Sequence, residues 1–103
     1  MMKTLKFNYM VWYYMNNYKI ICNLIGIYLN SIHVPYTFKH VQDEQQYSVE
    51  YMCKDHVISV NMSLVTPIIW GRVQTGCLLS PMFILLDKLE DFKQCIRSKC
   101  ILE

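Results

Sequence analysis

The clearest secondary-structure signal lies in residues 80–97, SPMFILLDKLEDFKQCIR. Ser80 is a favourable helix N-cap, and Pro81 suits the first helical position, where its missing N–H costs nothing. Apolar residues then recur at helical spacing and form one stripe, which consists of Met82, Leu85, Leu86, Leu89, Phe92 and Ile96. Arg97 and Lys99 lie near the end, where positive charge opposes the helix dipole favourably. We therefore predict an amphipathic helix over residues 80–97.

Outward from this helix, the chain alternates between strand-like and helix-like patterns. Aromatic and β-branched runs predict strands, and apolar spacing of three and four residues predicts helices. The predicted strands are Met10–Tyr14, Val34–Val41, Val57–Val60 and Leu64–Trp70, and the predicted helices are Tyr18–Asn30 and Asp43–Cys53. Gly71–Gly76 is predicted as a turn. The order β-α-β-α-β-β-α predicts an α+β or α/β fold, either one small domain over residues 1–103 or a palm-like fragment.

Two local features support these assignments. Alternation in the strand over residues 34–41 places Tyr36, Phe38 and His40 on one face and Thr37, Lys39 and Val41 on the other. The acidic pair Asp43-Glu44 complements the positive end of the helix dipole predicted after it.

The composition excludes some classes of protein and favours others. Of the 103 residues, 53% are hydrophobic and 17% are charged, which argues against a wholly disordered chain. The formal net charge of +2 is too small to indicate nucleic-acid binding by itself. Five cysteines at irregular spacing argue against a disulfide scaffold and favour a reducing, intracellular setting. No apolar run reaches the ~18 residues that a spanning helix needs, so we expect no membrane.

Residues 73–89, VQTGCLLSPMFILLDKL, resemble a segment of the palm of reverse transcriptases of the non-LTR retrotransposon type. That family has a Gln-Gly-Cys-x-Leu-Ser-Pro block followed by an apolar helix, and residues 76–81 match it in order. Thr75 stands where the family has Gln, and Gln74 is one place away. The resemblance implies that five residues lie near nucleic acid, namely Gln74, Gly76, Cys77, Ser80 and Pro81.

A polymerase of that family needs acidic side chains that hold two metal ions for phosphoryl transfer. The chain has four aspartates, none adjacent to another and none in the family's catalytic context: Asp43, Asp55, Asp87 and Asp91. We therefore expect a catalytically inactive fragment of a reverse transcriptase-like protein, with no catalytic residue, metal ligand or cofactor of its own. Mg²⁺ is expected only in an intact polymerase, and nucleic acid only through a larger parent protein. A palm fragment would also expose a sheet edge, which favours self-association.

A second resemblance covers more of the chain. Residues 29–36, LNSIHVPY, and residues 45–51, QQYSVEY, are similar to segments of glutathione transferases, which begin with a thioredoxin-like domain. Lys19 or Cys22 falls where that family places its thiolate-stabilising residue, so the alternative is a binding module of this kind. A third hypothesis is an open reading frame without stable function, because Ala is absent and Gly is scarce, as in AT-rich or decayed coding sequence.

Cys53-x-x-His56, together with His33 and His40, carries the residue types that bind zinc. The two pairs lie on unlike predicted elements. We therefore predict surface histidines and a half-buried cysteine at these positions, and no metal site.

Overall fold

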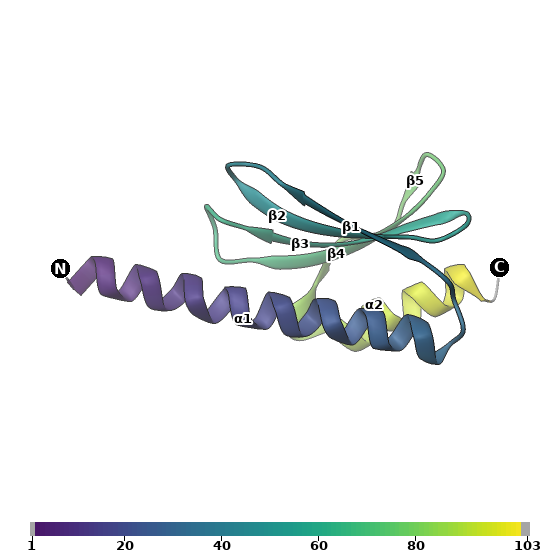
Figure 1. Ribbon diagram of the computed structural model, residues 1–103, viewed down its shortest axis with the longest axis horizontal. Coiled ribbons are helices and arrows are strands. Elements are labelled where there is room, and N and C mark those ends of the chain that lie inside the picture. The colour runs from purple at the N-terminus through teal and green to yellow at the C-terminus, as the bar shows by residue number, and fades with distance from the viewer. Residues whose placement is uncertain (1, 102–103) are drawn as a thin grey trace.

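The computed structural model describes residues 2–101, with side chains described from Val11 onward. Within that range, two helices enclose six strands in chain order (Figure 1). The helices are α1, Met2–Ser31, and α2, Leu85–Cys100. The strands are β1, Thr37–Gln42; β2, Gln46–Met52; β3, His56–Ser63; β4, Ile69–Thr75; β5, Leu78–Leu79; and β6, Phe83–Ile84. All these strands pair antiparallel and the helices lie outside the sheet, so the fold is α+β.

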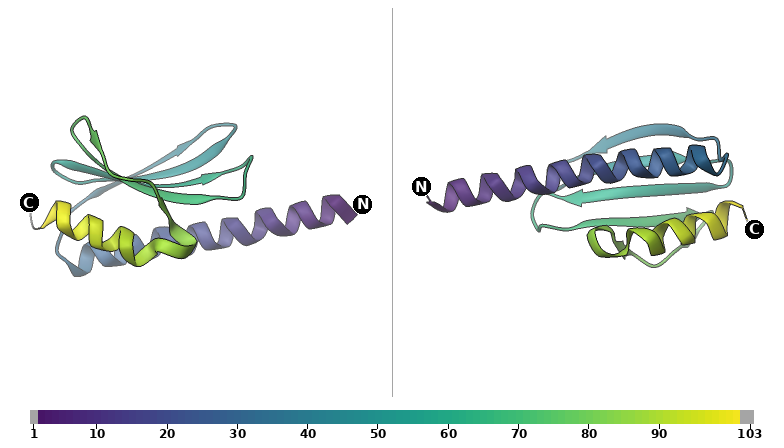
Figure 2. Two further views of the ribbon diagram at one scale, coloured as in Figure 1. Left: turned by 180° about the vertical axis from the view of Figure 1, so that it is seen from behind. Right: turned by 90° about the horizontal axis from the view of Figure 1, so that it is seen from below.

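The sheet is a meander in the order β1-β2-β3-β4-β5, and β6 also pairs with β4. Both helices lie against the same face of the sheet, as the two views of Figure 2 show. The opposite face, which we call the open face, has no helix on it. β3 confirms the strand predicted over residues 57–60, and β1 confirms the one predicted over residues 34–41 from Thr37 onward. Phe38 and His40 share a face as predicted, with ring centroids 4.9 Å apart.

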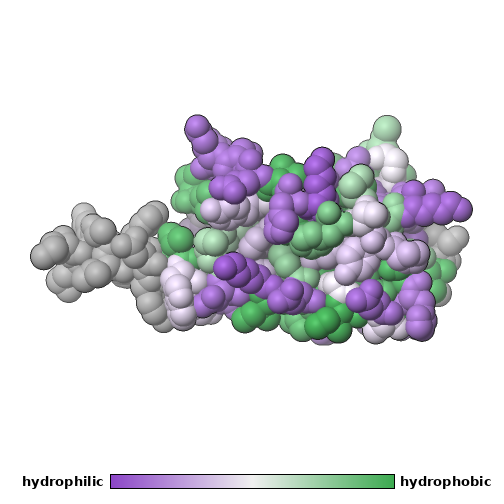
Figure 3. Space-filling model, viewed as in Figure 1, coloured by the Kyte–Doolittle hydropathy of each residue, from purple (hydrophilic) through white to green (hydrophobic). Residues whose placement is uncertain are grey.

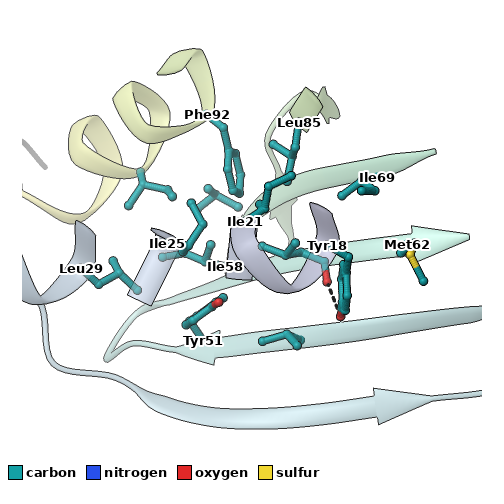
Figure 4. Close-up of a cluster of buried hydrophobic side chains, with 14 residues drawn as sticks. Tyr18, Ile21, Ile25, Leu29, Tyr51, Ile58, Met62, Ile69, Leu85 and Phe92 are labelled. Atoms are coloured by element: carbon teal, nitrogen blue, oxygen red, sulfur yellow. Dashed lines mark hydrogen bonds between the residues drawn. The ribbon is translucent and has the colours of Figure 1, made fainter. Parts of the chain in front are cut away.

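The core lies between the two helices and the sheet (Figure 4). α1 buries residues spaced three and four apart, namely Tyr18, Ile21, Ile25 and Leu29, which confirms the helix predicted over residues 18–30. α2 buries Leu85, Phe92 and Ile96 from the predicted stripe, and Leu89 packs against them half-buried. Leu86 is 40% exposed and lies off the buried stripe. The strands meet the helices with alternate residues, as a sheet with one buried face requires.

The predicted strand Met10–Tyr14 is wrong, because this segment lies inside α1. Strand propensity reflects packing on a pleated sheet surface, and this segment pairs with no strand: Trp12 and Tyr13 are 61% and 44% exposed. The helix continues through residues 10–14 into the buried stripe that begins at Tyr18. Although α1 spans 30 residues, no helix in the described part of the chain is both long enough and apolar enough to cross a membrane.

The predicted helix Asp43–Cys53 is also wrong, because residues 46–52 form β2. The Asp43 carboxylate does not begin a helix. Its Oδ1 accepts hydrogen bonds from the backbone N–H groups of Gln45 and Gln46 at 2.7 and 2.8 Å, which makes a tight turn after β1. Val49 and Tyr51 then face the core, while Ser48 faces the open side. The acidic pair therefore marks a turn, and the side chains that follow it alternate between the two faces of a strand.

The predicted strand Leu64–Trp70 and the turn Gly71–Gly76 are displaced along the chain. Residues 64–68 form the β3–β4 loop and residues 69–75 form β4. Gly71 is a strand residue at which a Cβ atom would lie 2.6 Å from the Phe92 ring. Gly76 does sit in a turn, with φ of +60°. The first glycine allows close packing of α2, and only the second allows a reversal of the chain.

The last helix begins four residues after the predicted Pro81 start and runs to Cys100 instead of residue 97. Ile84 is its N-cap and makes no side-chain capping hydrogen bond. The delay arises because Phe83 and Ile84 first pair with Gly71 and Trp70 of β4. Tertiary strand pairing thus prevails over the local capping signal of residues 80–81.

Candidate functional site

Three of the residues expected near nucleic acid lie together at the β4–β5 hairpin. Gln74 is exposed near the end of β4, and its Nε2 donates a hydrogen bond to the Gly76 carbonyl at 2.9 Å. Gly76 occupies the tip in a left-handed conformation that favours glycine. Cys77 follows it as an exposed free thiol. The structure therefore brings Gln74, Gly76 and Cys77 to one tip of the sheet.

The other two residues, Ser80 and Pro81, leave this tip. Ser80 is buried, and its N–H donates a hydrogen bond to the Val73 carbonyl at 2.8 Å. Its Oγ accepts a hydrogen bond from the Val73 N–H at 2.9 Å and donates one to the Pro81 carbonyl at 2.9 Å. Ser80 thus satisfies both backbone groups of Val73 in the gap between β5 and β6. We assign it a structural role, whereas Pro81 is exposed.

The four aspartates lie on separate elements. Asp43 is in the β1–β2 turn and Asp55 is in the β2–β3 turn, while Asp87 and Asp91 are on α2. In the part of the chain that the structure describes, no three His, Cys, Asp or Glu side chains are grouped so that they could hold a metal ion.

A polar hollow of about 280 Å³ lies on the open face, and we call it the open-face hollow. The polar side chains that line it come from β2, β3 and β4 and include Ser48, Glu50, Ser59, Asn61, Arg72 and Gln74. Because side chains alternate across a strand, these polar residues lie between the apolar residues that face the helices, and Val41, Val57 and Leu79 add apolar contacts at the hollow. The polar lining of the hollow therefore comes from the side chains of these three strands that point away from the helices.

Hydrogen bonds fix the floor of the open-face hollow. The Ser48 hydroxyl donates to Asn61 Oδ1 at 2.7 Å, and Asn61 Nδ2 donates to Ser59 Oγ at 3.2 Å and to the Trp70 carbonyl at 3.3 Å. Ser48 and Asn61 are 6% and 7% exposed. A buried and hydrogen-bonded polar network of this kind holds its members in defined positions. The floor is therefore preorganised across three strands.

Arg72 is the cationic group of the hollow. Its Nε is buried and has no hydrogen-bond partner among the described residues. Glu50 lies on the same cross-strand row, because Glu50 pairs with Ser59 and Ser59 pairs with Arg72. Within the described residues Glu50 and Arg72 form no ion pair with each other. The hollow therefore presents a cation and an anion on either side of a serine hydroxyl.

Sequence reasoning missed most of this hollow and named only Gln74 within it. The signal was present in residues 46–50 and 58–61, where polar residues alternate with apolar ones. A helix predicted over residues 43–53 hides that alternation, because a helix would place Ser48 and Glu50 on different sides. A turn predicted over residues 71–76 similarly hides Arg72.

A second cavity, of about 470 Å³, lies at the end of α2, and Cys53, His56 and Cys100 are among the residues that line it. A hydrogen bond from the Cys100 side chain lowers the pKa of the Cys53 thiol, although burial opposes that effect. Neither cysteine is part of a disulfide. This cavity therefore contains a thiol whose anionic form is favoured.

No family model matches this chain, and comparisons with curated proteins and with solved structures give no match. The function proposed below therefore rests on the geometry of the open-face hollow.

Proposed function

We propose that this chain is a catalytically silent binding module that holds an anionic group, a carboxylate or a phosphate, in the open-face hollow. The Arg72 side chain carries the proposal, because its buried Nε has no partner among the described residues. A buried donor without a partner costs about 1–3 kcal/mol. A ligand oxygen that accepts a hydrogen bond from Arg72 Nε would remove that cost.

The groups at and near Arg72 restrict the classes of ligand that the open-face hollow can bind. A guanidinium group presents a planar fork of donors that matches the two oxygens of a carboxylate or phosphate. Glu50 lies two strands away, which separates the two Cα atoms by roughly 10 Å. The hollow fits a ligand that has one anionic group for Arg72 and a hydrogen-bond donor or cation for Glu50.

The test is a titration of the ¹⁵N-labelled protein with sodium acetate and with sodium phosphate at constant ionic strength, followed by amide chemical shifts. We expect saturable shifts at residues that line the hollow. Arg72→Gln should abolish them. Arg97→Gln is the matched control, since it removes the same charge from an exposed position on α2. Shifts that are absent, that map elsewhere, or that both variants abolish would overturn the proposal.

The second candidate function is the one that the resemblance of residues 73–89 implies, in which the ligand is single-stranded nucleic acid. The observation that favours it is the position of Gln74, which belongs to that segment and lines the same hollow as Arg72. Phosphate groups commonly bind Arg and Gln side chains, and Glu accepts hydrogen bonds from base amino groups. The glutathione-transferase-like alternative stays a prediction of the sequence.

An eight-nucleotide single-stranded DNA tests this second candidate in the same titration. We expect it to bind more tightly than phosphate, with affinity that falls as salt rises. Gln74→Ala should weaken it, whereas Gln94→Ala on the exposed side of α2 should not. Binding of DNA no tighter than phosphate would end the second candidate and leave the first. Primer extension on a primed RNA template with Mg²⁺, if it survived repurification, would contradict catalytic silence.

A further inference from the structure

α1 carries a second apolar stripe on the side away from the sheet, and we call it the outer seam. It consists of Tyr13, Asn17, Ile20, Leu24 and Ile27. The apolar members are 44%, 55%, 41% and 63% exposed, in that order. Figure 2 shows the helices as the outer layer of the molecule, and Figure 3 shows hydrophobic patches between polar ones on the helical side. The outer seam is therefore open to contact.

The spacing of the outer seam is four, three, four and three residues, which is the heptad pattern of a coiled coil. In that pattern Tyr13, Ile20 and Ile27 take one core position, and Asn17 and Leu24 take the other. The buried stripe that starts at Tyr18 lies on a different side of the helix, so α1 is apolar on two sides. A surface helix normally has a polar outer side. Heptad spacing indicates that the unpartnered side is built for another helix.

The distribution of charge indicates which kind of helix the outer seam would bind. From Val11 to Ser31 the only charged residue is Lys19. The border of the outer seam repeats one residue type at intervals of seven, namely Asn16, Asn23 and Asn30. Interface centres are depleted in charge, and a two-fold interface brings the same patch of each subunit together. An uncharged seam avoids like-charge repulsion in that arrangement, and a single core asparagine can pair with its own copy.

We propose that the outer seam binds the outer seam of a second copy of this chain, and that the two α1 helices form a two-stranded coiled coil with the sheets on the outside. From Tyr13 to Ile27 the seam is about 21 Å long at the helical rise of 1.5 Å per residue. A two-helix contact of that length falls at the low end of specific interfaces, near ~1,000 Å² in total. We therefore expect a dimer of micromolar affinity. The seam is on the opposite side of the sheet from the open-face hollow, so this proposal does not depend on the ligand.

Sedimentation equilibrium between 1 and 200 µM, in reducing buffer so that the five cysteines form no crosslinks, tests the proposal. The chain has a mass of 12.3 kDa, and we expect the weight-average mass to rise toward twice that value. Ile20→Glu and Ile27→Glu each place a charge in the seam, opposite apolar or identical residues. Each should weaken the dimer by more than about 100-fold. Because both positions are exposed in the single chain, the circular dichroism spectrum should not change.

The matched control is Val65→Glu, which adds the same charge at an apolar residue that is 73% exposed in the β3–β4 loop. It should leave the dimer unchanged, and Ile20→Leu should do so as well. Asn17→Leu should tighten association, because a core asparagine costs stability. A wild-type chain that stays monomeric at 200 µM would overturn the proposal. A dimer that persists in both glutamate variants would also overturn it and would place the contact elsewhere, such as at the sheet edge.

Discussion

The phenolic hydroxyl of Tyr51 on β2 donates a hydrogen bond to the backbone carbonyl of Cys22 in α1. Tyr51 is 1% exposed, and its ring also contacts Tyr36 and Phe38, with centroids 5.4 Å away in each case. One side chain thus joins the long helix, the first strand and the second strand. This contact fixes α1 against the sheet, so that its buried stripe faces the core and the outer seam stays exposed.

Tyr51→Phe should lower the free energy of unfolding by about 1 kcal/mol, the usual net value of such a hydrogen bond. The ring stays and only the hydroxyl is removed, so the helix and strands keep their packing. Urea denaturation at pH 7 measures the change. Tyr47→Phe removes a hydroxyl from a half-buried side chain whose hydroxyl has no hydrogen-bond partner among the described residues, and it should have no effect. Equal stability of the Tyr51→Phe variant and the wild type would show that the bond contributes nothing.

Stability should fall above pH 9, because groups at this helix–sheet contact hold their protons more tightly when folded. Burial raises the pKa of the Cys22 thiol from about 9 to about 11 and raises the pKa of Tyr51 above its ordinary value. Because each pKa is higher in the folded state, the unfolded state loses these protons first as pH rises, and the free energy of unfolding falls. The contribution of Cys22 is complete below pH 9 and is lost by about pH 11. Urea midpoints from pH 7 to 11 measure it, and Cys22→Ala, which removes that contribution, should show a shallower fall.

Gly71→Ala should destabilise the fold by about 1–3 kcal/mol through overpacking. The added Cβ would lie 2.6, 2.7 and 2.9 Å from three ring atoms of Phe92. Phe92→Leu makes room, so the double variant should lose less stability than the two single variants together. Gly26→Ala is the comparison, because its Cβ meets only the Tyr36 hydroxyl, at 3.1 Å. Strict additivity of Gly71→Ala and Phe92→Leu would contradict the contact.

Ser80→Ala should cost about 1–3 kcal/mol, because it leaves the buried Val73 N–H without its acceptor. Hydrogen exchange separates this role from helix capping. We expect the Val73 amide to lose protection while the amides of α2 that follow its kink at Lys88 keep it, since that helix begins at Leu85 and not at Ser80. Ser98→Ala, at an exposed position of α2, should change neither. Loss of protection confined to the start of α2 would restore the capping role.

Cys53 should react with iodoacetamide faster than Cys22 at pH 8, as measured by peptide mass spectrometry. The thiolate is the reactive form; the Cys100 hydrogen bond lowers the pKa of Cys53, whereas burial raises that of Cys22. Cys100→Ala should slow the reaction at Cys53. Cys95→Ala, which removes a thiol that is not part of this pair, should not. Equal rates at Cys53 in the wild type and in Cys100→Ala would refute the pairing.

Local sequence patterns are enough to predict the elements whose periodicity fits only one kind of secondary structure. The spacing of Tyr18, Ile21, Ile25 and Leu29 predicted a helix, and the buried members of the α2 stripe followed from the same period. Alternation over residues 34–41 predicted which side chains share a face of β1, because a strand has only two faces. These patterns are local, and burial against the sheet reinforces them. The resemblance of residues 73–89 also named Gln74, which lies in the candidate site.

Where a local signal is compatible with two structures, long-range strand pairing selected between them. Asp43 can begin a helix or close a turn, and pairing of β2 with β1 and β3 selected the turn. Ser80 can cap a helix or hydrogen-bond to the backbone of β4. Because it lies between β5 and β6, it bonds to Val73 of β4. The open-face hollow depends on both outcomes, because Glu50 and Arg72 come within reach of one ligand only when β2, β3 and β4 lie side by side. Strand pairing joins residues far apart in the chain, so no local pattern records it.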